Sequence, residues 1–248
     1  MNALISRTSA SGLIKLTGRI SDYRVSRESA SFVFTESDQT KLGVVAIAAA
    51  LAGMGGQAMS TTSNATALEE EADYVEFNLG EKIVKGWLWR SPFKNGDYVE
   101  VAAEWQIDHY ETFGVCRPED KILALYPHCS RAKTRHIKNA LKWWLIITVI
   151  FETTLILSFA TDGWDDFLRF WTKSFEEDGA WFLSGMAVAF GIAIFSMAKK
   201  WMPFVNLAEK VFKILNLPNA SNLDLVKSSK NQRKNNDLPE FGSMYFRY

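Results

Sequence analysis

The chain has 248 residues, and its 28 basic and 28 acidic residues give a formal net charge of zero at pH 7. This length allows one or two domains, and the balanced charge excludes a general electrostatic attraction to nucleic acid. The mean hydropathy is close to zero, but that average combines a polar first half with two long apolar runs in the second half.

Residues 11–130 are predicted to form a β-rich domain that is interrupted by an insertion at 42–67. Alternating apolar and polar residues, together with turn signals such as Asn95-Gly96, favour a series of short strands joined by tight turns. Ser21–Arg27 reads as a polar turn or an irregular link between two of them. This pattern is typical of a small antiparallel barrel or sandwich. The expected strands are 13–20, 31–35, 74–79, 83–89, 98–105, 110–115 and 122–126.

The insertion contains an apolar run rich in alanine and glycine, Leu42–Met59. Three interpretations stay open: a further membrane span, an interfacial or re-entrant segment, or an insertion within a water-soluble domain. A single crossing would place the basic N-terminal segment outside, against the usual bias of Lys and Arg towards the cytoplasm.

Two segments, Thr17–Ile20 and Lys94–Val101, resemble parts of the oligonucleotide/oligosaccharide-binding (OB) barrel. Barrels of this kind serve many functions. Binding of nucleic acid needs a basic groove with exposed stacking aromatics, whereas the aromatics here alternate with acidic as well as basic residues. We therefore expect a core position for the aromatics and no nucleic-acid partner. They are Trp87, Trp89, Phe93 and Trp105.

Residues 131–200 are predicted to form a transmembrane helical hairpin. Its spans, about 143–160 and 180–198, each approach the roughly 20 apolar residues that cross a bilayer core. A polar loop, Thr161–Gly179, separates them. Met1–Ser11 has no signal-peptide pattern, so the hairpin would serve as its own insertion signal. The competing interpretation is a pair of buried helices in a soluble protein.

Charges beside the hairpin predict its orientation. Basic residues flank both spans, whereas the connecting loop is mainly acidic, so both flanks and both termini should be cytoplasmic. The basic residues would then lie at the lipid headgroups of an inner membrane. They include Arg131, Lys133, Arg135, Lys138, Lys199 and Lys200.

Glu152 lies near the middle of the first span, where a carboxylate is expensive. The second span offers small residues that allow close helix packing: Ser184, Gly185, Ala189 and Ala193. Glu152 is either a protonated group that hydrogen-bonds between helices, or part of an ion path or an assembly contact between copies.

No pattern in the sequence predicts an enzyme. The neighbours His128 and Cys129 form the densest chemical cluster, but no orienting carboxylate accompanies them. With Cys116 and His136 they lack a standard zinc spacing, and phosphate-binding and dinucleotide-binding motifs are missing. We expect no metal, no cofactor and no disulfide, because a cytoplasmic domain keeps its thiols reduced.

After the hairpin, residues 201–218 are predicted to form an amphipathic helix. It would lie either in the membrane interface or against the barrel. Residues 219–248 form a polar tail, with 219–236 expected to be mobile and the aromatic segment Phe241–Tyr248 a docking tail.

Three segments, Ser26–Glu36, Lys85–Phe93 and Ala124–Arg131, resemble a bacterial family labelled as type VI secretion system effectors. The resemblance covers roughly residues 11–200 and transfers no catalytic residues. It implies an envelope protein tied to antagonism between bacteria, and it implies no mechanism. The hairpin and the absence of a catalytic pattern favour an inner-membrane effector that acts by helix assembly. The alternatives are a resident immunity, scaffold or accessory protein whose β-domain binds a protein partner, and a barrel that binds a ligand.

Overall fold

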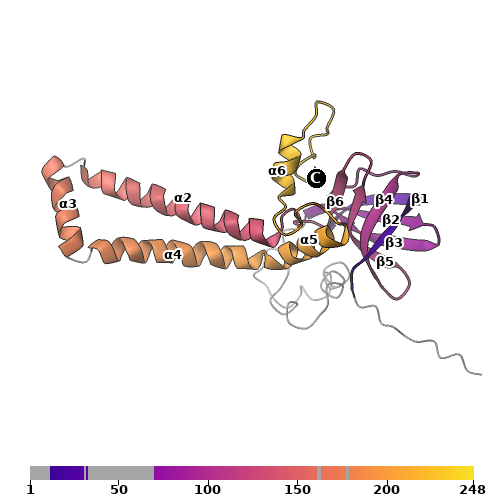
Figure 1. The fold of residues 1–248 in the computed structure, drawn as a ribbon, viewed down its shortest axis with the longest axis horizontal. Coiled ribbons are helices and arrows are strands. Elements are labelled where there is room, and N and C mark those ends of the chain that lie inside the picture. Colours follow the sequence, from indigo (N-terminus) through magenta and orange to yellow (C-terminus); the bar gives the residue numbers. More distant parts are fainter. Residues whose placement is uncertain (1–11, 31, 33–69, 161–162, 177–178) are drawn as a thin grey trace, which may run out of the picture. The chain divides into compact units, whose positions relative to one another are not determined.

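The computed structural model describes residues 12–30, 32, 70–160, 163–176 and 179–248. The chain divides into two compact units. One contains the chain up to Lys133 together with Pro203–Tyr248, and the other is Thr134–Met202 (Figure 1). Residues on both sides of the predicted hairpin therefore build the same unit.

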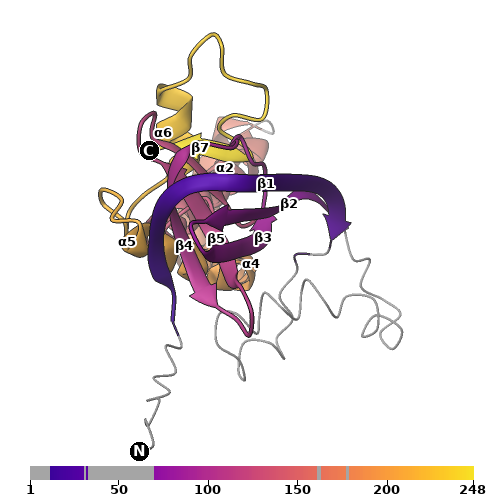
Figure 2. The ribbon, with the colours of Figure 1, turned by 90° about the vertical axis from the view of Figure 1, so that its right-hand side faces the viewer.

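Five strands of the first unit form a closed barrel (Figure 2). β1 pairs antiparallel with both β2 and β4, while β3 closes the barrel by a short parallel pairing with β5. The predicted barrel is confirmed, with one parallel pairing in place of an all-antiparallel arrangement. The strands are β1 Ile14–Ala30, β2 Glu70–Leu79, β3 Lys82–Leu88, β4 Tyr98–Trp105 and β5 Tyr110–Arg117.

The predicted turn at Ser21–Arg27 is wrong, because β1 continues through it. The first part of β1 pairs with β4 and the second part with β2. The pairing shifts between Ser21 and Arg24, and Asp22 has a φ of 52°. Such an irregularity bends a strand, and the polar composition reflects the exposure of this bent section to solvent.

Alternate side chains of the strands fill the barrel. Val75, Phe77, Val84, Val101 and Val115 are among the buried members of this interior cluster. The period of two that predicted these strands is thus the period of the core.

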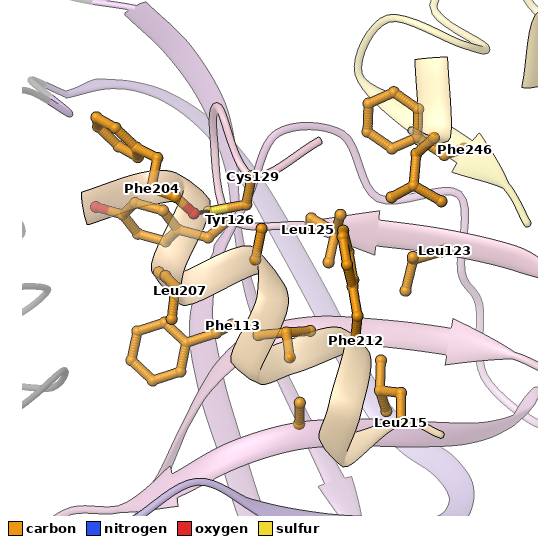
Figure 3. Packing of buried hydrophobic residues seen from close by; sticks show 14 of the residues in the cluster. Phe113, Leu123, Leu125, Tyr126, Cys129, Phe204, Leu207, Phe212, Leu215 and Phe246 are labelled. Atoms are coloured by element: carbon orange, nitrogen blue, oxygen red, sulfur yellow. Dashed lines mark hydrogen bonds between the residues drawn. The ribbon is translucent and has the colours of Figure 1, made fainter. Parts of the chain in front are cut away.

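Helix α5, Met202–Ile214, packs on the outside of the barrel, next to β5 and β6 (Ile122–Leu125) (Figure 3). Its apolar stripe is buried, so the predicted amphipathic helix lies against the barrel and the interfacial interpretation is wrong. A Cβ on Gly114 would be only 2.7 Å from Val211 Cγ1. Glycine at this position lets the helix approach the sheet.

The C-terminal tail is folded, contrary to the prediction of a mobile segment at 219–236. Helix α6, Leu225–Asn231, begins at Asp224, whose carboxylate accepts a hydrogen bond from Lys227 N. This is ordinary N-capping. β7, Tyr245–Arg247, then pairs antiparallel with β6, which confirms the docking tail.

The second unit is an antiparallel pair of long helices, α2 (Lys133–Ala160) and α4 (Gly179–Lys200). Trp144 Nε1 donates a hydrogen bond to Ala187 O at 2.9 Å. The rings of Phe151 and Phe190 meet with centroids 5.1 Å apart.

The predicted polar loop at 161–179 is wrong over most of its length, because α3, Trp164–Glu176, runs across the ends of α2 and α4 (Figure 1). Its polar residues form one side of an amphipathic helix, and this mixture gave the segment its loop-like composition.

Two helical segments, Lys133–Ser158 and Trp181–Lys200, are long and apolar enough to cross a membrane. Their side chains are almost entirely unburied within the unit. This excludes the pair of buried helices that was the competing interpretation. By itself, the length and composition of two helices is weak evidence for a membrane protein.

Leu42–Met59 lies outside the described residues, as does most of the expected strand at 31–35. Ala30, the last residue of β1, and Glu70, the first residue of β2, are direct partners in the β1–β2 ladder. The chain therefore leaves the barrel and returns to it at the same place.

Replacing Phe212 by alanine should lower the free energy of unfolding by about 3–5 kcal/mol, because this ring is fully buried between α5 and the barrel. Urea titration of the detergent-solubilised protein, followed by tryptophan fluorescence, measures the change. Asn206→Ala, at an exposed position of α5, is the matched control and should change the free energy by less than about 0.5 kcal/mol. Equal effects of the two variants would contradict the packing of α5.

Candidate functional site

Glu152 lies half-buried on α2, one turn after Thr148. Thr148 is only 8% exposed, and its hydroxyl has no hydrogen-bond partner within the described residues. Trp144, Thr148 and Glu152 follow one another at intervals of four, which keeps them near one side of a helix. Trp144 contacts α4, so Glu152 lies at the edge of the contact between the helices. In the part of the chain that is described, no hydrogen bond or ion pair holds its carboxyl group.

The small residues of α4 face away from this contact. Ser184, Gly185, Ala189 and Ala193 are all exposed, and a Cβ on Gly185 would meet nothing within 4 Å. The structure therefore does not bring Glu152 together with these four residues inside one hairpin. Their role in assembly stays a prediction.

The close packing of the hairpin depends on Gly191 rather than on Gly185. A Cβ on Gly191 would lie 3.3 Å from Trp144 Nε1, so the indole occupies the space that glycine leaves. The indole N–H of this half-buried ring also finds a backbone acceptor, which spares the cost of burying an unpaired donor. The contact between Trp144 and Gly191 sets the rotation of α4, whereas the even spacing of small residues in the sequence points to another side of this helix.

The predicted basic residues divide between the two units. Arg131 Nε lies 3.5 Å from Asp224 Oδ1, and the backbone N–H of Lys133 donates to Glu209 Oε2. These contacts lie within the barrel unit, which includes Lys133, the first residue of α2. In the helical unit, Lys138, Lys199 and Lys200 are exposed, and Arg135 is half-buried. Their place at lipid headgroups stays a prediction.

The His128–Cys129 cluster is built as a structural junction. Cys129 is buried, its thiol donates to Phe204 O at 3.5 Å, and burial raises the pKa of the thiol far above its usual range. A thiol in this state is a poor nucleophile. This geometry gives Cys129 a packing role within the first unit.

His128 is held in place from three sides. Its ring lies between those of Trp89 and Phe204, with centroids 5.0 and 5.1 Å away, and its Nε2 is 3.1 Å from Glu70 Oε2. Burial lowers the pKa of His128, and the neighbouring Glu70 carboxylate opposes this shift.

Cys116 is buried elsewhere and donates to the hydroxyl of Tyr248 at 3.2 Å, while burial raises the pKa of its thiol to about 11. Both cysteines are free. Among the residues that the structure describes, no group of three His, Cys, Asp or Glu side chains is arranged to hold a metal ion.

One end of the barrel has a hollow of about 430 Å³ between the β2–β3 turn and the β4–β5 turn. Trp105 lies at this hollow and is 51% exposed, so its expected core position is wrong. Trp87 and Phe93 are buried as expected, and Trp89 is half-buried. The hollow is lined by Leu79, Glu81, Lys82, Ile83, Trp105, Asp108 and Tyr110.

Behind the β4–β5 turn, Glu111 is a largely buried carboxyl group that the sequence analysis did not single out. It pairs across the ladder with Glu104, and His109 Nε2 lies 3.4 Å from its Oε2. Burial raises the pKa of Glu111 to about 7, although His109 acts in the opposite direction. Only the fold reveals this environment, because it depends on the strands that flank Glu111.

No family model, no curated protein and no solved structure matches this chain.

Glu111→Gln should make the protein less sensitive to alkaline pH. An ordinary glutamate has a pKa near 4.3 when unfolded, so the folded protein, with a pKa of about 7 at Glu111, binds the extra proton between these values. Stability therefore falls as pH rises through this window. We expect the free energy of unfolding of the variant to exceed that of the parent protein by about 2 kcal/mol at pH 8 in urea titrations, and by less at pH 5.

Glu119→Gln, at an exposed position near the next turn, is the matched control and should leave the pH dependence unchanged. A parent protein whose stability rises between pH 5 and 8, with Glu111→Gln following the same curve, would contradict the shifted pKa.

Proposed function

We propose that this chain is a bacterial inner-membrane protein in which α2 and α4 cross the bilayer as a hairpin. The observation that carries the proposal is the almost complete exposure of two apolar helices of membrane-spanning length. Large exposed apolar surfaces need a cover. A bilayer covers both helices along their whole length and leaves their internally hydrogen-bonded backbones satisfied.

The barrel supports this topology independently of charge. Its unit uses the chain up to Lys133 and again from Pro203 onwards, so both ends of the hairpin must be on one side of the membrane. Two crossings satisfy this requirement and one does not. The basic flanks then favour the cytoplasmic side for the barrel and for both termini.

Within this frame, we favour a membrane-acting effector that works by assembly of helices. Glu152 and Thr148 are polar groups without described partners at mid-span depth, where such groups usually mark function. The exposed small residues of α4 offer a surface for close helix contact between copies. The resemblance to the type VI secretion family points to the same class of activity.

A resident immunity or accessory protein is the second candidate. The half-exposed Trp105 beside the barrel hollow favours it, because exposed tryptophan is typical of protein-binding surfaces. The strand order β1-β2-β3-β5-β4 also matches the OB barrel, which is used widely as a binding module.

Val188→Arg should reduce membrane integration. Val188 is 60% exposed near the centre of α4, and an arginine at mid-span costs about 2.5–3.5 kcal/mol for insertion. The measurement is the share of protein that stays in the membrane pellet after alkaline carbonate extraction. Ile107→Arg, which changes an exposed apolar residue of the barrel, is the matched control and should leave that share unchanged. A parent protein found in the soluble fraction would contradict the proposal.

Expression of the chain in a bacterial host should depolarise the inner membrane, and Glu152→Gln should reduce the effect several-fold because it removes the carboxyl group from the proposed span. Depolarisation is followed with a potential-sensitive dye, at equal amounts of membrane-integrated protein. Asp166→Asn, at an exposed position of α3, controls for the loss of a charge. Harmless expression that instead protects the host from a toxin would favour the immunity role.

A further inference from the structure

The helix between the two proposed spans has two distinct sides. Trp164, Phe167 and Leu168 recur at intervals of three and four, which places them on one side of α3. In the sequence, Trp171 continues this spacing. Acidic and basic residues occupy the opposite side. They include Asp165, Asp166, Arg169 and Lys173.

Two residues on the apolar side of α3 are open to water within the second unit. Trp164 is 69% exposed and Leu168 is 45% exposed. The Trp164 and Phe167 rings stack with centroids 5.1 Å apart, and this contact leaves most of the Trp164 surface in water, where apolar surface is unfavourable.

The short connections to α2 and α4 keep α3 close to the ends of these two helices. α2 ends at Ala160 and α3 begins at Trp164, while only residues 177 and 178 separate α3 from α4. Since a residue reaches at most about 3.6 Å, the start of α3 stays within about 14 Å of the end of α2. If α2 and α4 cross the membrane, α3 is held at its surface.

We propose that α3 lies in the interface of the membrane, with Trp164, Phe167 and Leu168 among the upper parts of the acyl chains. This inference rests on the proposed function. Tryptophan prefers this depth because its ring is apolar and its N–H is polar. The segment between the spans is then a third membrane contact of the hairpin.

The charges of α3 make the contact independent of the charge of the lipid headgroups. Its acidic residues, Asp165, Asp166 and Glu176, outnumber the basic Arg169 and Lys173, so no attraction to anionic lipid is available. Asp165 and Asp166 lie in the first turn and Lys173 in the last, where they offset the helix dipole. The apolar side alone therefore drives the contact.

The test places single cysteines on the full-length protein, reconstituted in phosphatidylcholine vesicles and labelled with a fluorescent dye. Leu168→Cys reports the apolar side of α3 and Asp166→Cys the polar side. Val149→Cys and Val188→Cys, at exposed positions of α2 and α4, report the spans. Iodide measures access from water, and lipids with a quencher near the headgroup measure interfacial depth. The native cysteines are buried, so the labelled parent protein gives the background.

The expected result is strong lipid quenching at Leu168→Cys, with an iodide quenching constant several-fold below that at Asp166→Cys. Both should stay unchanged when phosphatidylglycerol is added to the vesicles. Phe167→Cys should repeat the behaviour of Leu168→Cys, which guards against a local disturbance in one variant.

Three other results would overturn the inference. Equal iodide access at Leu168→Cys and Asp166→Cys, with Val149→Cys and Val188→Cys protected, removes the interfacial helix but keeps the membrane hairpin. Protection of Leu168→Cys from iodide without lipid quenching means that a second copy or another protein covers α3. Iodide access at Val149→Cys and Val188→Cys removes the proposed function itself, and the inference with it.

Discussion

The packing of α5 against the barrel constrains everything else in this molecule. Phe212 and Val211 pack on the outer surface of β5 and β6, in one buried cluster with residues from the first half of the chain. The long excursion through α2, α3 and α4 must therefore leave and return at the same folded unit. Any membrane topology has to contain an even number of crossings between Lys133 and Pro203. The hairpin meets this condition with the smallest number of spans.

This constraint separates two kinds of apolar surface that look alike in composition. The stripe of α5 is covered by the barrel, and the interior side chains of the strands are covered by one another. The surfaces of α2 and α4 are covered by almost nothing within their unit. An average hydropathy near zero hides this division, because the polar exterior of the barrel offsets the apolar exterior of the helices.

Much of the fold could be predicted from the sequence because local pattern and final environment agree. Strands such as Tyr98–Trp105 alternate with a period of two and fill a barrel with the same period. The long helices are apolar over enough consecutive residues to be recognised by length alone. Prediction failed where the environment is set by distant partners. The polar stretch of β1 reads as a turn, but its pairing with β2 makes it a strand. The tail at 219–236 reads as mobile, but Arg247 Nη1 donates a hydrogen bond to the carbonyl oxygen of Gln232 at 2.8 Å.

The same limit of sequence-based prediction applies to the individual side chains of the candidate site. Sequence spacing identifies Glu152 and the small residues of α4, but it cannot say how the helices are rotated. That rotation follows from Trp144, whose indole needs both the space beside Gly191 and the carbonyl of Ala187. It turns Gly185 and Ala189 outwards and leaves Glu152 at the edge of the contact between α2 and α4. Contact between copies through the small residues would thus be a separate event from pairing of the Glu152 carboxyl group.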